Sequence, residues 1–237
     1  MGYAVIFMHR QFSLQPYSRH YTHSTNCFLD FMELKSDGSI GVNSKYAPKM
    51  KSVLEKYQEF KKNETLLLLT FVTVTDYLFL LRSVTKIMSV LKENAMYYLA
   101  AAVSDFFIPA QKMSQHKIQS EGGGLTLMMD QVPKFLKPMV TNWVPDGFIV
   151  SFKLETDPAL LVDKSRLALM RYGHQIVIAN LLTTRKREVV LITRGSEFPI
   201  KLTEDEIAED KEIESKIIPE LVKRHHEWIR DAGHADL

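Results

Sequence analysis

Short apolar runs alternate with segments of helical periodicity along most of the chain. Residues 66–74 and 148–154 are nearly continuous apolar stretches of strand length, and 97–103 and 175–182 are further strand candidates. Such runs are typical of strands buried on both faces of a mostly parallel sheet. Because helical segments separate them, the pattern predicts an α/β fold with helices on both faces of the sheet.

Helix boundaries are marked by capping residues. Asp157, followed directly by a proline, predicts the start of a helix over 159–172, and Gly173 stands where a left-handed C-terminal cap belongs. Either Thr75 or Asp76 is expected to cap the helix that follows the strand at 66–74. The chain therefore carries local signals that place its helices between its strands.

Three other segments complete the expected topology. Residues 11–41 are polar and lack a clear period, which predicts a long loop. Residues 189–193 and 198–202 are expected to pair as a hairpin. The charged segment 204–230 is predicted to be one terminal helix, kinked at its internal proline.

Composition narrows the class of protein. Hydrophobic residues make up 46% of the chain and the formal net charge is +2. This argues against disorder and against nucleic-acid binding driven by net charge. The single cysteine, Cys27, and the lack of a long unbroken apolar stretch predict a cytosolic protein without a membrane span. No repeat or linker is evident, so we expect a single domain over 1–237.

Polar residues follow three of the predicted strands. Asp105, Glu155 and Asn180 each stand where a strand candidate ends. Ligands of open α/β sheets bind beyond the carboxyl ends of the strands. We therefore expect these three positions to meet at one edge of the sheet.

Each candidate also has a purely structural interpretation. Small residues at Ala101 and Ala102 allow a ligand to approach the backbone, or simply allow close packing. Asp105 offers an acceptor, or caps a turn. Lys117, in the segment 106–124 that ends in three glycines, can neutralise a phosphate on a mobile flap, or is merely solvated.

The remaining motifs are equally ambiguous when taken singly. The segment 152–158 leads into a helix N-terminus, which is either an anion site or an ordinary cap. Asn180 suits a base or an amide, or a turn. The histidines show no metal-ligand spacing. Another possible class is a dinucleotide-binding oxidoreductase, but no G-x-G-x-x-G motif is present, which argues against it.

Taken together and in order, the motifs resemble phosphopantothenate–cysteine ligase, especially its animal form. They are the segments 98–106 (YLAAAVSDF), 116–120 (HKIQS), 152–158 (FKLETDP) and 179–180 (AN). The resemblance is strong from residue 95 onward and looser before it. It implies a Rossmann-like three-layer α/β/α fold that works as a homodimer.

The resemblance also implies a reaction and its participants. The family joins 4′-phosphopantothenate to cysteine through an acyl-nucleotide intermediate in coenzyme A synthesis. Animal forms use ATP and bacterial relatives use CTP. Mg²⁺ is implied, with Asp105 as one candidate ligand and the rest of the metal site unknown. Neither flavin nor NAD is expected.

Residue roles follow by position within the matching motifs. Three residues are expected to hold the pantothenate portion: Ala101, Ala102 and Asp105. Four are expected along the nucleotide: Lys117, Phe152, Lys153 and Asn180. Lys117 is also expected to act in catalysis, since a cation on a closing loop stabilises the charge that develops at phosphorus.

The start of the chain differs from the family pattern. The family begins with a strand, a Gly-Gly-Thr nucleotide loop and an Asn-Phe-Ser-Ser-Gly phosphate-binding segment, whereas Met1-Gly2-Tyr3 matches its second strand. We therefore expect a sheet that lacks the family's first strand. The alternative function is a catalytically inactive truncated relative that acts by dimerising with the full-length ligase.

Overall fold

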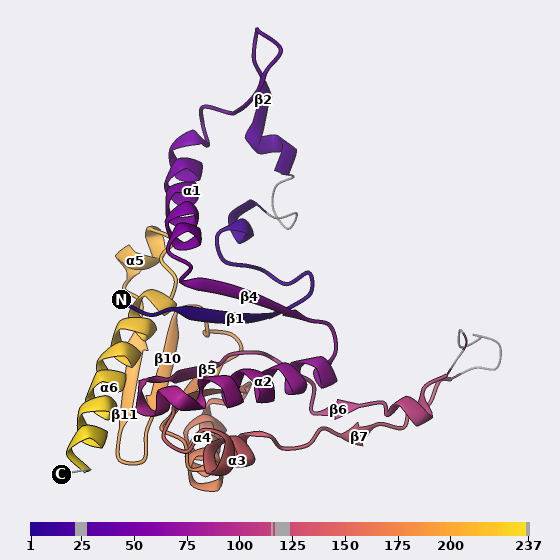
Figure 1. The fold of residues 1–237 in the computed structure, drawn as a ribbon, viewed down its shortest axis with the longest axis vertical. Coiled ribbons are helices and arrows are strands. Elements are labelled where there is room, and N and C mark those ends of the chain that lie inside the picture. The colour runs from indigo at the N-terminus through magenta and orange to yellow at the C-terminus, as the bar shows by residue number, and fades with distance from the viewer. Residues whose placement is uncertain (22–27, 115, 117–123, 236–237) are drawn as a thin grey trace. The chain divides into compact units, whose positions relative to one another are not determined.

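The computed structural model describes residues 1–21, 28–114, 116 and 124–235. The chain divides into two compact units, Met1–Tyr77 and Leu78–Leu237. Figure 1 shows the elements of both. Helices and strands occur in each unit, which confirms the α/β class.

The first unit is built on a parallel pair of strands. Strand β1 (Val5–Arg10) pairs in register with β4 (Leu66–Phe71). Between them in sequence lie η1 (Ser18–Tyr21), η2 (Phe28–Phe31), β2 (Met32–Leu34), β3 (Ile40–Val42) and α1 (Ala47–Lys62). Within the described residues β4 pairs with β1 alone, and Leu67 and Leu68 are exposed. The expectation that this strand is buried on both faces was therefore wrong.

The segment expected to be a long loop contains a hairpin instead. Strands β2 and β3 pair antiparallel around a tight turn. In this turn Asp37 Oδ1 accepts hydrogen bonds from the Ser39 backbone N–H at 2.9 Å and from its hydroxyl at 2.7 Å. Gly38 has a φ of +81°, which costs glycine little. The Asp37-Gly38 pair is a hairpin signal that the periodicity argument missed.

The second unit is organised around a five-stranded sheet with the order β11-β10-β9-β8-β5. Its strands are β5 (Met96–Leu99), β8 (Phe148–Glu155), β9 (Ile176–Leu181), β10 (Glu188–Ile192) and β11 (Glu197–Lys201). The β5–β8 and β8–β9 pairs are parallel, whereas β9–β10 and β10–β11 are antiparallel. The sheet is thus mixed rather than mostly parallel, because two consecutive short turns return the chain after β9.

Helices and short elements complete the second unit. Helix α2 (Val74–Met88) spans the boundary between the units. The elements that follow it are η3 (Ser89–Asn94), β6 (Phe106–Phe107), η4 (Ala110–Lys112), β7 (Asp130–Gln131), α3 (Leu136–Pro138), the π-helix η5 (Met139–Trp143), α4 (Pro158–Tyr172), α5 (Glu204–Ala208) and α6 (Glu214–Ala235). No helix among the described residues is both long and apolar enough to cross a membrane.

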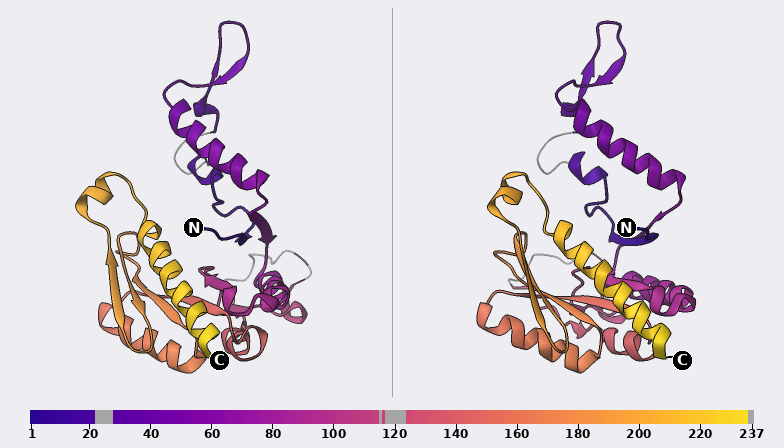
Figure 2. Two further views of the ribbon diagram at one scale, coloured as in Figure 1. Left: turned by 60° about the vertical axis from the view of Figure 1, so that its left-hand side comes forward. Right: turned by 90° about the vertical axis from the view of Figure 1, so that its left-hand side faces the viewer.

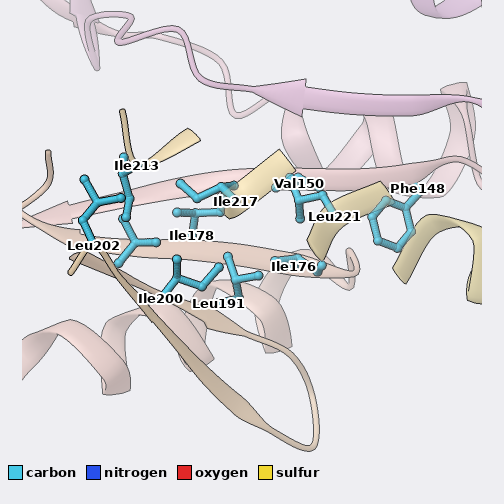
Figure 3. Packing of buried hydrophobic residues seen from close by; sticks show 11 residues of the cluster. Phe148, Val150, Ile176, Ile178, Leu191, Ile200, Leu202, Ile213, Ile217 and Leu221 are labelled. Atoms are coloured by element: carbon cyan, nitrogen blue, oxygen red, sulfur yellow. The ribbon is translucent and has the colours of Figure 1, made fainter. Parts of the chain in front are cut away.

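Helices α4 and α6 cover opposite faces of the five-stranded sheet (Figure 2). On one face, Ile217 and Leu221 of α6 pack in a cluster with Val150 and Ile178 of the sheet (Figure 3). On the other, α4 packs against alternate residues of β9, including Val177. Since strand side chains alternate between faces, the two clusters fix which side chains of β8 and β9 point toward which helix.

Local capping sets the bounds of α4, as the sequence predicts. The Asp157 carboxylate accepts a hydrogen bond from the Ala159 N–H at 2.9 Å. Gly173 ends the helix with a φ of +82°, and its N–H donates to the Leu169 carbonyl at 2.8 Å. The end of β8 and the start of α4 are therefore held in a defined turn.

The terminal segment differs from its prediction. It forms two helices rather than one, and Asp210, with a φ of +56°, lies between them. Helix α5 begins with a capping box in which Thr203 and Glu206 exchange side chain–backbone hydrogen bonds. Pro219 lies inside α6. The break is therefore set by the backbone turn before α6 and not by the proline.

Candidate functional site

A cavity of about 510 Å³ lies beside the carboxyl-terminal parts of β5 and β8. Its walls come from the segment that follows β5, from residues 132–136, from β8 and from one side of α4. All of these elements belong to the second unit. The position agrees with the rule that α/β sheets bind ligands beyond the carboxyl ends of their strands.

The cavity brings together four of the residues that the sequence singled out. They are Ala101, Asp105, Phe152 and Lys153. Ala102 is next to the wall in sequence but does not itself line it. Lys117, the predicted catalytic lysine, lies outside the described residues, as do most of the central residues of the expected flap.

Asn180 does not line the cavity. On β9 it follows Ile176 and Ile178 at even spacing, so its side chain lies on the sheet face covered by α6. Its buried Oδ1 has no hydrogen-bond partner among the described residues. Asn180 was expected to lie with Asp105 and Glu155 at one edge of the sheet, but it does not line the cavity that Asp105 lines.

Two lysines at the cavity are anchored by one carboxylate. Glu155 accepts from Lys164 Nζ at 2.9 Å and from Lys153 Nζ at 3.1 Å, and its side chain is 12% exposed. The hydrogen bond from Lys164, and then that from Lys153, lowers the pKa of Glu155 below its ordinary value. The carboxylate therefore stays ionised at neutral pH and holds both ammonium groups beside the cavity.

The lining as a whole is cationic. Four basic residues line the cavity: Lys134, Lys153, Lys164 and Arg171. Asp105 is the single acidic residue among the described lining residues, and Lys134 Nζ pairs with its carboxylate at 2.9 Å. The sequence analysis missed the two basic residues on α4, although their spacing of seven places them on one helix face. Such a lining suits an anionic ligand.

The oxygen donors that the structure describes at the cavity do not form a site for Mg²⁺. Among the residues that the structure describes, no group of three or more His, Cys, Asp or Glu side chains converges as in a metal site. Asp105 already accepts from a lysine. The described side chains therefore do not fit a metal held by the protein itself.

A serine–histidine pair lies at the wall formed by β8. Ser151 lines the cavity, and its Oγ lies 2.7 Å from Nε2 of His174. His174 is 1% exposed, and burial lowers its pKa to about 4. The imidazole is therefore neutral at physiological pH.

The segment expected to be a flap begins as a two-stranded arm. Strands β6 and β7 pair antiparallel, and they run side by side in Figure 1. Lys112 Nζ lies 2.5 Å from Asp130 Oδ1 and bridges the two sides of the arm. The central residues 117–123 are not described, so the flap role of 106–124 stays a prediction.

Comparison with known proteins first gives the class of domain. Residues 57–216 match the family model described as the DNA/pantothenate metabolism flavoprotein C-terminal domain. This matched segment includes β5, β8, α4 and thus the whole cavity.

Individual relatives then narrow the class to one enzyme family. Human phosphopantothenate–cysteine ligase is 42% identical over 235 residues, which cover 97% of this chain and 75% of that protein. The ligase CAB2 of Saccharomyces cerevisiae is 43% identical over 249 residues, covering 96% and 66%. A solved structure of a Cab2 mutant in complex with phosphopantothenate-cysteine has a TM-score of 0.89 at 41% identity, covering 98% and 75%. The chain belongs to the phosphopantothenate–cysteine ligase family.

Proposed function

We propose that this chain is an ATP-dependent ligase that joins 4′-phosphopantothenate to cysteine in coenzyme A biosynthesis. The observation that carries the proposal is the cavity, which combines four basic residues with one acidic residue in a chain of this family. Both the nucleotide and the phosphorylated acid are anionic. A cationic wall therefore lowers the electrostatic cost of bringing them together.

The proposed chemistry proceeds in two steps. The substrate carboxylate attacks the α-phosphorus of ATP, and pyrophosphate leaves. The cysteine amine then attacks the acyl carbon of the acyl-nucleotide, and AMP leaves as the amide forms. No electrons are exchanged, so the proposal requires neither flavin nor NAD. No side-chain nucleophile is required either, and the protein's contribution is to position the reactants and to stabilise the developing charge.

Roles for individual residues are part of the proposal. Three residues hold the pantothenate portion: Ala101, Ala102 and Asp105. Four contact the nucleotide: Lys117, Phe152, Lys153 and Asn180. For Lys153 the support is geometric, because Glu155 anchors its ammonium group at the cavity. For Lys117 and Asn180 the support is the resemblance of the motifs. We further propose that residues 106–124 form an active-site flap and that the chain is a Rossmann-like ligase domain. We also propose that it works as a homodimer and is located in the cytosol.

The test is a coupled assay of pyrophosphate release. Purified chain is mixed with 4′-phosphopantothenate, cysteine and Mg²⁺, with ATP or CTP. Lys153→Gln removes one positive charge from the cavity. Lys186→Gln, at an exposed position outside the cavity, removes a matched charge. We expect turnover that depends on both substrates and falls roughly tenfold or more in Lys153→Gln, as for the loss of a hydrogen bond to a charged group.

Several outcomes of this assay are decisive. Turnover that falls in Lys153→Gln but not in Lys186→Gln supports both the reaction and the site. Equal rates in the two variants exclude Lys153 from the site. A folded chain that neither turns over nor binds ATP or 4′-phosphopantothenate in calorimetry overturns the proposed function.

A further inference from the structure

The contact between Ser151 and His174 joins the cavity wall to the protein interior. Ser151 shares one face of β8 with Lys153, and both line the cavity. The backbone of Ser151 is fixed, since it pairs with Leu99 on one side and with Val177 on the other. The Cβ atom of Ser151 is therefore held at a defined place, and only the rotations about the Cα–Cβ and Cβ–Oγ bonds remain to set where the hydroxyl points.

The imidazole that meets this hydroxyl is also held firmly. His174 stands between two anchored residues. On one side Gly173 closes α4 through its bond to the Leu169 carbonyl. On the other, the Gln175 side-chain carbonyl accepts from the Ile149 N–H of β8 at 2.8 Å. The ring thus has little freedom to move away from Ser151.

The surroundings of the ring decide where its proton lies. Ser151 Oγ is the polar partner of Nε2, whereas Nδ1 is buried without a partner among the described residues. A proton on Nδ1 would leave a buried N–H donor unpaired, and such orphaned donors are rare in folded proteins. A proton on Nε2 leaves only a lone pair unpaired and makes the 2.7 Å contact a hydrogen bond to Ser151. We therefore assign the Nε2–H tautomer.

This tautomer determines what Ser151 offers to a ligand. Its oxygen accepts from His174, so its own O–H is not used by the ring. No other partner of this hydroxyl is found in the described part of the chain. Lys153, on the same strand face, adds positive charge to the same wall. We propose that His174 is a positioning residue that turns the Ser151 O–H toward a phosphoryl or carboxylate oxygen of the ligand in this cavity.

ATP and 4′-phosphopantothenate both carry such oxygens, so the identity of the ligand rests on the proposed function. The hydrogen-bond arrangement of Ser151 and His174 does not depend on the proposed function. Its direct test is ¹⁵N NMR of the histidine rings in the ligand-free chain, with His174→Gln used to assign the signal. We expect the proton of His174 on Nε2 at neutral pH. A proton on Nδ1, or a charged ring, overturns the proposal even if the chain is an active ligase.

Binding measurements test the consequence for the ligand. Calorimetry is carried out with ATP, 4′-phosphopantothenate and inorganic pyrophosphate separately, on folded Ser151→Ala, His174→Gln and His174→Phe. We expect Ser151→Ala to weaken the binding of one ligand roughly tenfold or more. His174→Phe should weaken the same ligand, whereas the amide of His174→Gln, which can still donate, should preserve more of the affinity.

The identity of the affected ligand tells the two sources apart. Weaker binding of ATP and pyrophosphate places Ser151 at the nucleotide phosphates, and weaker binding of 4′-phosphopantothenate alone places it at the acid. A double variant of Ser151→Ala and His174→Phe that binds no more weakly than either single variant supports action through one hydrogen bond. Unchanged affinity of Ser151→Ala for all three probes overturns the proposal. If a variant does not fold, the NMR result decides.

Discussion

Acidification should destabilise the second unit through His174. Its pKa is about 4 in the folded chain against an ordinary value of 6.5, because the ring is buried. The unfolded chain therefore binds the proton more tightly than the folded one. This contribution to stability is fully present above pH 6.5, falls as the pH drops, and is exhausted near pH 4. A difference of about 2.5 pKa units corresponds to about 3 kcal/mol in the free energy of unfolding.

The assay is urea unfolding between pH 7 and pH 4, followed by tryptophan fluorescence. Both tryptophans, Trp143 and Trp228, lie in the second unit, so the signal reports on it. His174→Gln is the reference, because glutamine does not titrate. Other groups with lowered pKa values, such as His225 and Glu155, are present in both proteins and cancel in the difference. Parallel pH dependence of the two proteins would refute the reasoning.

Three other changes have defined outcomes. Leu221→Ala removes a fully buried side chain and should cost roughly 2–5 kcal/mol in urea unfolding, whereas Met170→Ala, at an 81% exposed position, should cost little. Gly173→Ala should cost about 1 kcal/mol in thermal unfolding because its φ is +82°, while Gly195→Ala, which has no such φ, should not. Glu155→Gln should lower turnover in the pyrophosphate assay by releasing two lysines, and an unchanged rate would contradict that anchoring role.

Features that depend on neighbouring residues were the ones that sequence reasoning predicted well. The caps of α4 at Asp157 and Gly173 are side-chain and backbone contacts within a few residues, so the local sequence is sufficient to specify them. Local signals can still be misjudged. The helix after β4 was expected to be capped by Thr75 or Asp76, but Thr73 Oγ1 accepts from the Asp76 N–H at 3.1 Å, which places the cap earlier.

The pairing of strands that are distant in sequence was harder to predict from the sequence. The apolar pattern of a strand does not indicate which other strands it pairs with. The mixed sheet arises because β9 is followed by two antiparallel strands in succession. Likewise the apolar run of β4 indicated burial, but within the described residues its one strand partner is β1. Periodicity reports which side chains prefer to be buried, and only the assembled sheet decides whether they are.

The sequence by itself determined the α/β class, most strand and helix positions, and the order of motifs that marks the ligase family. Only the tertiary structure decided which of those motif residues share a cavity. Lys153 and Lys164 meet at Glu155, and Ser151 meets His174 across 23 positions of sequence. Asn180 instead lies on the opposite sheet face from α4. The physical reason is that a motif consists of residues close together in sequence, whereas a site depends on the order of strands in the sheet and on the two-residue alternation of side chains between the faces of a strand.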